Sequence, residues 1–532
     1  MPPLNSGSST SAGVYTGERD NSIRVTALPT SIGAIVGPSH RGPVGVPTLV
    51  VDQEDFEFKF GYSDSSLTFM HFCANAFLED SNRLYVLRVA VNAKLGGVKI
   101  ATVSNFAQAV PFTSGLDDPQ DIVFGATDIL WLYAANPGEW NNDVRVLLYP
   151  DTNDSSGEGF VLSIFEGSTT VPQETYRGTL FDKINGFGDQ LNIVNQLEEA
   201  KSRLRALVNY DHPGFAVDPR AQLINALAPG ALSQGTRGDA VTVSDIANAW
   251  DSFADVEEVS VNILINCGYT DVTVQQRMLE VAENRDDCFA ILDIPSNKQE
   301  AQDAVNWRRN TLAASTSYGA AYVPDLKVRD TRVARDVFIP CSGHVAGVFA
   351  RTDRVSAAWF APAGITRGQL NVLSLRQTYK QGHRDILAEN QINPLVSMPG
   401  NGIVVWGADT LQSYASSLSN INVRRLVSLL KRSIENAVLT GVFEQNDVFL
   451  RDELKNMCDA ICDPVKRGRG LYGYENICDD RNNSTENIAN GDVILDVYLD
   501  PVLPAKRIHL NAIIPKTGQI KFAQELINAT AA

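Results

Sequence analysis

Val259-Ser-Val-Asn-Ile-Leu-Ile265 and Cys288-Phe-Ala-Ile-Leu-Asp-Ile294 are the two stretches that decide the fold. Each is a short apolar run of strand length, and apolar residues at helical spacing separate them. A second helical pattern leads from 294 to a third short strand at Gly319–Val323. Strands that alternate with helices at this spacing predict parallel pairing with right-handed crossovers. The middle of the chain is therefore expected to be an α/β region.

The residues before this region have a different pattern. Thr242-x-x-Asp245 is a capping-box signature that begins a helix. Upstream of it, residues 96–180 contain short β-branched runs separated by Gly, Pro, Asp and Asn, which predicts a small β-sandwich. Residues 1–20 are rich in Ser, Gly, Thr and Asn, and Val14 and Tyr15 are their only sizeable apolar pair. Such a segment cannot bury a core by itself, so it is expected to be disordered or an extended arm.

The last third of the chain resumes an α+β pattern. Strands are predicted at 402–407, 493–499 and 507–513, and the last of these alternates enough to pair at a sheet edge. Its Ile508 and Leu510 are candidates for a contact with another chain. A predicted helix around 423–438 has an apolar face, and its other face carries four cations: Arg424, Arg425, Lys431 and Arg432. This basic face is either solvated or docked against an acidic surface of a neighbouring subunit or partner.

Bulk properties narrow the possible functions. At 532 residues the chain is expected to form several domains. Its formal net charge of −17 repels phosphate backbones, so nucleic acid is not an expected partner. The sequence predicts no secretory signal and no membrane-spanning helix. Seven scattered cysteines are expected to be reduced thiols, and Cys458, Cys462 and Cys478 fit no common zinc pattern.

The motifs of common enzymes are missing from the sequence. There is no Gly-x-Ser-x-Gly elbow, no phosphate-binding loop and no dinucleotide fingerprint. Ser342-Gly-His344 places a serine beside a histidine without predicting a catalytic triad, and Asp293 is interpreted as the end of a strand. No catalytic residue, metal or cofactor is predicted. A hydrolase or nucleotide binder built on the α/β region stays as the alternative class.

Short motifs along most of the chain resemble the bacteriophage contractile tail sheath family, in the family's order. Asn141 stands where the family commonly has glycine, and Gln234 and Arg237 depart from its glycine-rich loop. The matching stretches include Ala12-Gly-Val-Tyr15, Leu28-Pro-Thr-Ser31, Arg41-Gly-Pro43, Asn136-Pro-Gly-Glu-Trp140, Leu232-Ser-Gln-Gly-Thr-Arg-Gly238, Pro340-Cys-Ser-Gly-His-Val-Ala-Gly347, Ala361-Pro-Ala-Gly364, Val405-Trp-Gly-Ala408 and Asn422-Val-Arg-Arg425.

The resemblance implies a multidomain fold, part α/β and part α+β. The N- and C-terminal segments together would form a tail-sheath core. A β-sandwich and a subtilisin-like α/β domain without a catalytic triad would be inserted into it. The expected division is an N-terminal arm at 1–20, core at 21–95, the sandwich at 96–185, the subtilisin-like domain at 186–364, core again at 365–505 and a C-terminal arm at 506–532.

The resemblance also implies a structural function. Such a chain would be a virion component, assembled in the host cytoplasm, that polymerises as stacked hexameric rings around a tail tube. Contraction would drive the tube through the host envelope during genome delivery, and a genome-free phage-derived injection particle would use the same subunit chemistry. The implied partners are other copies of the chain, the tube protein, and baseplate and tail terminator or neck proteins, without direct contact with nucleic acid or membrane. The terminal arms would join neighbours by adding strands to their sheets.

Overall fold

A nine-stranded sheet is the centre of the computed structural model, which describes residues 31–62, 68–154 and 156–510. Its strands run in the order β17-β20-β19-β14-β13-β12-β1-β3-β2. From β3 to β19 neighbouring strands are parallel, and antiparallel strands complete both edges. The predicted mixed α/β architecture is thereby confirmed. The strands are β1 Gly33–Gly37, β2 Thr48–Val50, β3 Leu84–Arg88, β12 Ile263–Ile265, β13 Phe289–Asp293, β14 Gly319–Val323, β17 Gln369–Leu370, β19 Ile392–Met398 and β20 Gly402–Val405.

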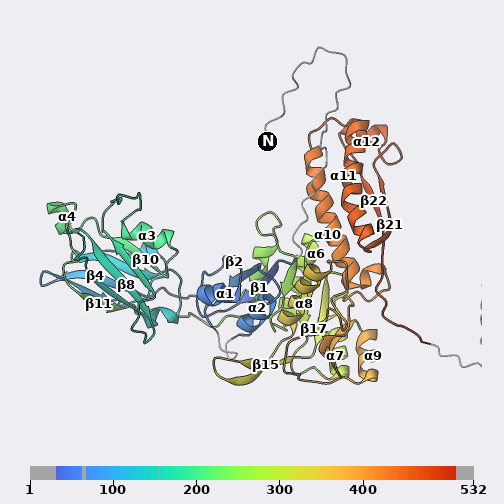
Figure 1. Ribbon diagram of the computed structural model, residues 1–532, viewed down its shortest axis with the longest axis horizontal. Coiled ribbons are helices and arrows are strands. Elements are labelled where there is room, and N and C mark those ends of the chain that lie inside the picture. The colour runs from blue at the N-terminus through green and yellow to red at the C-terminus, as the bar shows by residue number, and fades with distance from the viewer. Residues whose placement is uncertain (1–30, 63–67, 155, 511–532) are drawn as a thin grey trace, which may run out of the picture.

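Helices cover both faces of this sheet. In β1, Ala34 and Val36 belong to one hydrophobic core and Ile35 to the other, as the alternation of side chains along a strand requires. Helices α1 Gln53–Phe60, α2 Met70–Leu78 and α8 Ser342–Val355 pack on the Ile35 face. The opposite face is covered by α5 Val243–Ala249, α6 Val272–Arg285, α7 Ala301–Trp307 and α9 Gln381–Glu389. The sheet and these helices are called the body below (Figure 1).

The N-terminal segment is part of the same sheet as the α/β region. Strand β1 pairs with β12 on one side, with Ala34 opposite Leu264, and with β3 on the other. On the far side, β14 pairs with β19, which comes from the predicted C-terminal core. The pairing within this sheet joins strands from the predicted segments 21–95, 186–364 and 365–505. The predicted limits at residues 95, 186 and 364 therefore do not follow the edges of the sheet.

Two four-stranded antiparallel sheets lie beyond one end of the body (Figure 1). One has the order β10-β6-β4-β5 and the other β11-β7-β8-β9, and they share one hydrophobic core. We call this unit the outer sheets. Since β10 and β11 lie in it, the unit extends past the predicted limit at residue 185. Its elements are β4 Gly97–Val103, β5 Phe106–Pro111, β6 Asp128–Ala134, β7 Val144–Pro150, β8 Phe160–Glu166, β9 Glu174–Gly178, α3 Ile193–Glu199, β10 Leu204–Val208, α4 Pro213–Val217 and β11 Ala228–Ala231.

The chain enters and leaves the outer sheets through two segments that lie side by side. The amide of Asp239 donates to the carbonyl of Val91 at 2.8 Å, and the amide of Lys94 donates to the carbonyl of Thr236 at 3.1 Å. The buried Arg88 guanidinium also donates to the carbonyls of Gly42 and Pro137 at 2.7 Å each. These hydrogen bonds attach the outer sheets to the body at β3.

A helical hairpin rises from the opposite end of the body. Helices α10 Ile421–Val438 and α11 Val448–Arg467 pack together and against a two-stranded antiparallel sheet. That sheet consists of β21 Leu471–Ile477 and β22 Asp496–Pro501, with α12 Thr485–Asn490 between them in sequence. The predicted strand at 493–499 thus begins three residues later.

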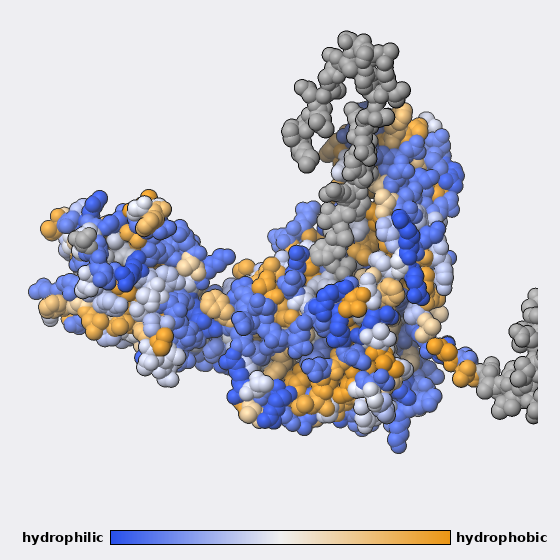
Figure 2. All heavy atoms as spheres, in the orientation of Figure 1, coloured by the Kyte–Doolittle hydropathy of each residue, from blue (hydrophilic) through white to orange (hydrophobic). Residues whose placement is uncertain are grey.

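A small three-stranded sheet, β16-β15-β18, completes the architecture of the described residues. Its strands are β15 Leu326–Asp330, β16 Arg335–Ile339 and β18 Ser374–Leu375. Figure 2 shows that the visible surface is mostly hydrophilic, with hydrophobic side chains gathered over the body near β15 and β17. Among the helices of residues 31–62, 68–154 and 156–510, none has the length and apolar character needed to cross a membrane.

Candidate functional site

Asp293, Ser342 and His344 lie near one another in sequence or space but do not form a catalytic triad. The Asp293 carboxylate accepts hydrogen bonds from the backbone amides of Ser342, at 2.8 Å, and Gly268, at 2.9 Å. The Ser342 hydroxyl accepts from the amide of Cys267 at 3.0 Å. His344 follows Ser342 by two positions on α8, and residues two apart on a helix do not face each other.

Asp293 instead holds the beginning of α8 against the end of β13. Burial raises the pKa of its carboxyl to about 6, while the hydrogen bonds from Ser342 and Gly268 lower it. The side chain is 1% exposed. A carboxylate at a helix N-terminus satisfies amides that have no partner within the helix. The interpretation of Asp293 as a strand end with a structural role agrees with this geometry.

Asp293→Asn should lower the free energy of unfolding by about 1–3 kcal/mol. The asparagine side chain has only one acceptor oxygen, whereas the backbone N–H groups of Ser342 and Gly268 each need an acceptor. Urea denaturation measures the change. Asp271→Asn is the matched control: Asp271 caps α6 through one bond, from the amide of Thr273 at 2.9 Å, and asparagine caps equally well. An equal, small effect in both variants would contradict the assigned role.

The histidines contribute a pH dependence to stability. Burial lowers the pKa of His71 to about 4, although Glu57, 4.0 Å away, raises it. Below its ordinary pKa of 6.5 the unfolded chain binds a proton that the folded chain does not bind until about pH 4. As far as His71 is concerned, the free energy of unfolding therefore has its full value above about pH 6.5 and falls as the pH drops toward 4.

Between pH 7.5 and 5 the wild type should lose about 2 kcal/mol more unfolding free energy than His71→Gln. The Asp293 carboxyl, whose pKa is raised, acts in the opposite direction in both proteins and cancels. His383→Gln, an exposed position on α9, serves as the control and should keep the wild-type dependence. Equal pH dependence in wild type and His71→Gln would contradict the prediction.

The cysteines are all free and buried. Burial raises the pKa of Cys458 to about 12 and that of Cys462 to about 11, so both thiols are protonated at neutral pH. Within the described ranges no group of three or more His, Cys, Asp or Glu side chains is arranged to hold a metal ion.

The predicted basic face of α10 divides into two parts, and its first part is not a surface. Arg424 and Arg425 are buried. Arg425 binds Asp353 of α8 through two hydrogen bonds, of 2.8 and 2.6 Å. The guanidinium of Arg424 lies 4.3 Å from the ring centroid of Tyr318. The prediction of one open basic face is wrong here, because the first half of α10 is enclosed by the body.

Lys431 and Arg432 form the second part. Lys431 donates to Asp286, the left-handed residue that ends α6, and Tyr318 donates to the same carboxylate. Arg432 pairs with Glu435 on its own helix at 3.0 Å. The Lys431 side chain stays 57% exposed. An acidic partner for the basic face thus exists within the chain itself, and a contact with another subunit stays a prediction for these two residues.

The predicted terminal contacts are only partly described. Val14 and Tyr15 lie outside the described residues. Ile508 and Leu510 are 88% and 92% exposed. The described part of the predicted strand at 507–513 pairs with none of the strands within residues 31–62, 68–154 and 156–510.

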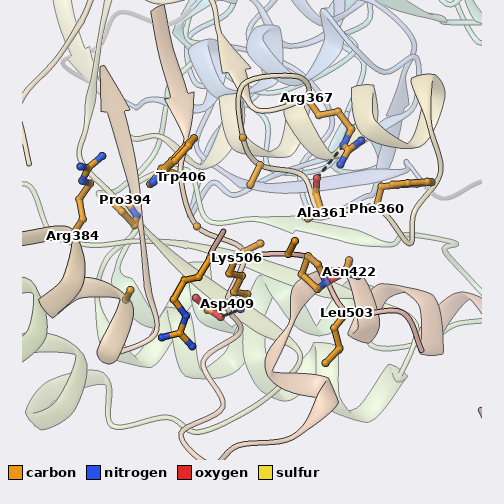
Figure 3. A pocket seen from close by; sticks show the side chains of 18 of the residues that line it. Phe360, Ala361, Arg367, Arg384, Pro394, Trp406, Asp409, Asn422, Leu503 and Lys506 are labelled. Atoms are coloured by element: carbon orange, nitrogen blue, oxygen red, sulfur yellow. Dashed lines mark hydrogen bonds and ion pairs between the residues drawn. The ribbon is translucent and has the colours of Figure 1, made fainter. Parts of the chain in front are cut away.

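Just before these residues, the chain runs along a groove of about 1540 Å³ (Figure 3). We call it the groove. Phe360, Arg367, Arg384, Trp406 and Lys506 are among its lining residues, and they come from the body and from the C-terminal segment. Lys506 forms an ion pair with Asp409 across it. The sequence did not predict the groove, since its residues meet only through tertiary packing.

A second feature that the sequence reasoning missed is the turn between α10 and α11. We call Leu439–Phe449 the tip. It exposes apolar side chains that belong to no helical stripe: Leu439, Val442, Phe443, Val448 and Phe449. The run Val442-Phe-Glu-Gln-Asn-Asp-Val-Phe449 could have indicated an exposed apolar turn, because its apolar residues fit neither the helical period nor the strand period.

Two family models match adjacent parts of the sequence. One, described as the phage tail sheath protein central domain, matches residues 239–411. The other, the phage tail sheath C-terminal domain, matches residues 413–514. Together they cover just over half of the chain.

Curated relatives carry the same description. The tail sheath protein of Enterobacteria phage T4 is 28% identical over 471 residues, which are 79% of this chain and 69% of that protein. The tail sheath protein of Vibrio phage KVP40 is 27% identical over 428 residues. That match covers 74% of this chain and 63% of the KVP40 protein, so the chain spans less than two thirds of this relative's length.

Solved structures share the fold. A sheath tail protein from Listeria innocua superposes with a TM-score of 0.59 at 8% identity, over 90% of this chain and 96% of that one. The helical sheath of the anti-feeding prophage in its contracted state gives a TM-score of 0.54 at 15% identity, over 94% and 98%.

Proposed function

We propose, from the premise that this chain belongs to the phage tail sheath protein family, that copies of it polymerise into a contractile sheath around a tail tube. The family consists of structural proteins of contractile tails, and the chain is accordingly not an enzyme. The proposed sheath is a stack of hexameric rings whose contraction drives the tube through the host cell envelope. No nucleotide hydrolysis is involved, because the energy is stored in the interfaces between copies.

The observation that carries this proposal is the two-stranded sheet beside the hairpin. Within the described residues β21 and β22 pair only with each other, so each strand has an open edge. A two-stranded sheet is marginal alone and gains stability from added strands. The segments at 1–20 and 506–532 are the proposed arms that supply them from neighbouring copies. Main-chain pairing of this kind keeps neighbours joined while their rigid bodies rotate.

We propose a division of labour among the units described above. The hairpin and its sheet, with the N-terminal arm, hold neighbours together around the tube. The outer sheets act as an inserted β-sandwich that projects outward. The middle of the nine-stranded sheet corresponds to the subtilisin-like domain implied by the family resemblance, and the geometry of Asp293, Ser342 and His344 supports its having no triad.

The proposed partners follow from this assembly. They are other copies of the chain, the tube protein inside the sheath, and the baseplate and terminator or neck proteins at its ends. The particle is assembled in the host cytoplasm and becomes part of the virion. Electron microscopy of the purified protein tests the proposal: hollow striated tubes are expected, whereas a monomer that never polymerises would overturn it.

The exposed cations of α10 supply a second test. Lys431→Glu with Arg432→Glu should weaken polymerisation about tenfold, because rim charges steer and orient subunits. The stability of the monomer should change by less than about 1 kcal/mol, since exposed ion pairs contribute little. Light scattering measures assembly, and Arg220→Glu on the outer sheets is the matched reversal. Unchanged assembly and contraction in the double variant would refute the role of these residues.

A further inference from the structure

The tip combines exposed apolar area with an unusual backbone. The Phe443 side chain is fully exposed, and its φ of 69° lies in the left-handed region that aromatic residues rarely adopt. Phe449 is also exposed. Both features cost free energy in an isolated chain and are typical of a surface that is buried on binding. The tip lies at the end of the hairpin, away from the body (Figure 1).

The tip is also acidic. Leu439–Phe449 contains Glu444 and Asp447 and no cation. Both carboxylates are exposed, and Asp447 caps α11 through the amide of Leu450 at 2.9 Å. Within the described part of the chain no ion pair involves Glu444. A partner surface for the tip should therefore be both apolar and basic.

The groove has this chemistry. Its apolar lining includes Trp406, which is 41% exposed, and Tyr472, which is 68% exposed. Its cations are Arg367, Arg384, Arg469, Lys506 and Arg507, and its carboxylates are Asp385, Glu389 and Asp409. The groove thus carries two more positive than negative side chains, although the whole chain has a net charge of −17.

Several groove cations lack a carboxylate partner. Lys506 pairs with Asp409, whereas no ion pair within the described residues involves Arg384 or Arg469. Arg384 and Trp406 are both seen in the close view of the groove (Figure 3). Unpaired guanidinium groups beside exposed aromatic rings are suited to bind carboxylates and aromatic side chains together.

The tip and the groove of one chain cannot meet. The tip ends in the first turn of α11, whereas Arg469 and Tyr472 lie just after the other end of this helix. Helix α11 has 20 residues, so the two features are held about 30 Å apart by a rigid element. A contact between them must join two copies. Since the two surfaces differ, the contact is head-to-tail and propagates into a ring or a helix.

We propose that the tip of one copy docks into the groove of a second copy. Phe443 and Phe449 pack against Trp406 and Tyr472, and Glu444 pairs with the guanidinium groups of Arg384 and Arg469. The contact rests on the self-assembly proposed above and adds to it a side-chain interface, separate from strand addition by the arms. A single contact of this size is weak, and it stabilises the assembly because it is repeated between many copies.

Cross-linking between two single-cysteine variants tests the contact. Gln445→Cys in the tip and Ala388→Cys in the lining of the groove, both exposed and neither one of the proposed contact side chains, are mixed and treated with a short bis-maleimide. All seven native cysteines are buried, so the engineered thiols react. A covalent dimer is expected in the mixture and in neither variant alone. Tubes without this dimer, or a cross-link from the tip to a different tail protein, would overturn the proposal.

This result is distinguishable from a failure of the proposed function. If no tubes form, the polymerisation proposal fails. The mixture of the two soluble variants at high concentration still reports on the contact: a dimer supports it, and no dimer overturns it.

A second pair of variants separates docking from folding. Phe443→Gly removes the side chain at a position whose φ favours glycine, so the variant should melt at the same temperature or higher. The concentration needed for polymerisation should rise about tenfold or more, as for an aromatic hot spot. Phe187→Gly, an almost fully exposed phenylalanine of the outer sheets, is the matched control and should polymerise normally.

Charge exchange completes the test. Glu444→Arg and Arg384→Glu should each raise the concentration needed for polymerisation, and the chain that carries both changes should recover much of the loss. Phe443→Gly polymerising like the wild type, or no recovery in the double variant, would overturn the proposal.

Discussion

Asp353→Ala should lower the free energy of unfolding by about 3–5 kcal/mol, the largest effect expected of a single substitution here. Asp353 and Arg425 are both nearly inaccessible to water, with side-chain exposures of 4% and 6%. Their two hydrogen bonds connect α8 of the body to α10 of the hairpin. Removing the carboxylate takes two charge-assisted hydrogen bonds from a buried guanidinium group. Urea denaturation of the soluble subunit measures the loss.

The control is an ion pair on the same helix that faces water. Glu435→Ala removes the partner of Arg432, at 3.0 Å and three positions away, and should change stability by less than about 0.5 kcal/mol. Asp353→Leu combined with Arg425→Met should recover much of the loss, because a well-packed apolar pair avoids the cost of burying charge. Equal effects of Asp353→Ala and Glu435→Ala would contradict this account.

Deleting residues 1–20 should abolish polymerisation under conditions where the full chain forms tubes. A strand added to an open edge forms several main-chain hydrogen bonds, each contributing about 0.5–1.5 kcal/mol. Their loss should raise the concentration needed for polymerisation by at least about a hundredfold. The monomer should stay folded, because the two large cores consist of residues from Ile32 onward. Electron microscopy and circular dichroism measure the two outcomes.

A pair of substitutions distinguishes strand addition from side-chain binding by the arm. Val14→Pro removes a main-chain donor and should impair assembly, whereas Val14→Ala keeps the donor and should be milder. Tubes of normal appearance from the shortened chain would refute the arm mechanism.

Local patterns in the sequence predicted the elements of the body well. The apolar runs around β12 and β13 and the helix between them were recognisable because burial on both faces demands nearly continuous apolar strands. The capping box at Thr242 also formed as predicted, with Asp245. The pairing of β1 with β12 was not predictable in this way, because partners 230 positions apart leave no local periodicity.

The basic face shows the same limit for a site. The interpretation left the basic face of α10 either solvated or docked against a neighbouring subunit or partner, and it did not include a partner within the same chain. Arg425 instead meets Asp353, 72 positions away, and Arg424 stacks on Tyr318. Amphipathicity identifies the face that must be buried, but it cannot exclude that the other face is buried as well. The tip and the groove were not predicted for a related reason, because no periodic pattern in the sequence marks either of them.

The paired segments at Val91–Asp239 and Lys94–Thr236 have a consequence for how such chains diversify. Entry and exit of the outer sheets are held within hydrogen-bonding distance, so for the body this whole unit is equivalent to a single surface loop. Loops with adjacent ends tolerate large changes in length. The outer sheets can therefore be exchanged, enlarged or lost over evolutionary time without altering the register of β3 or β12.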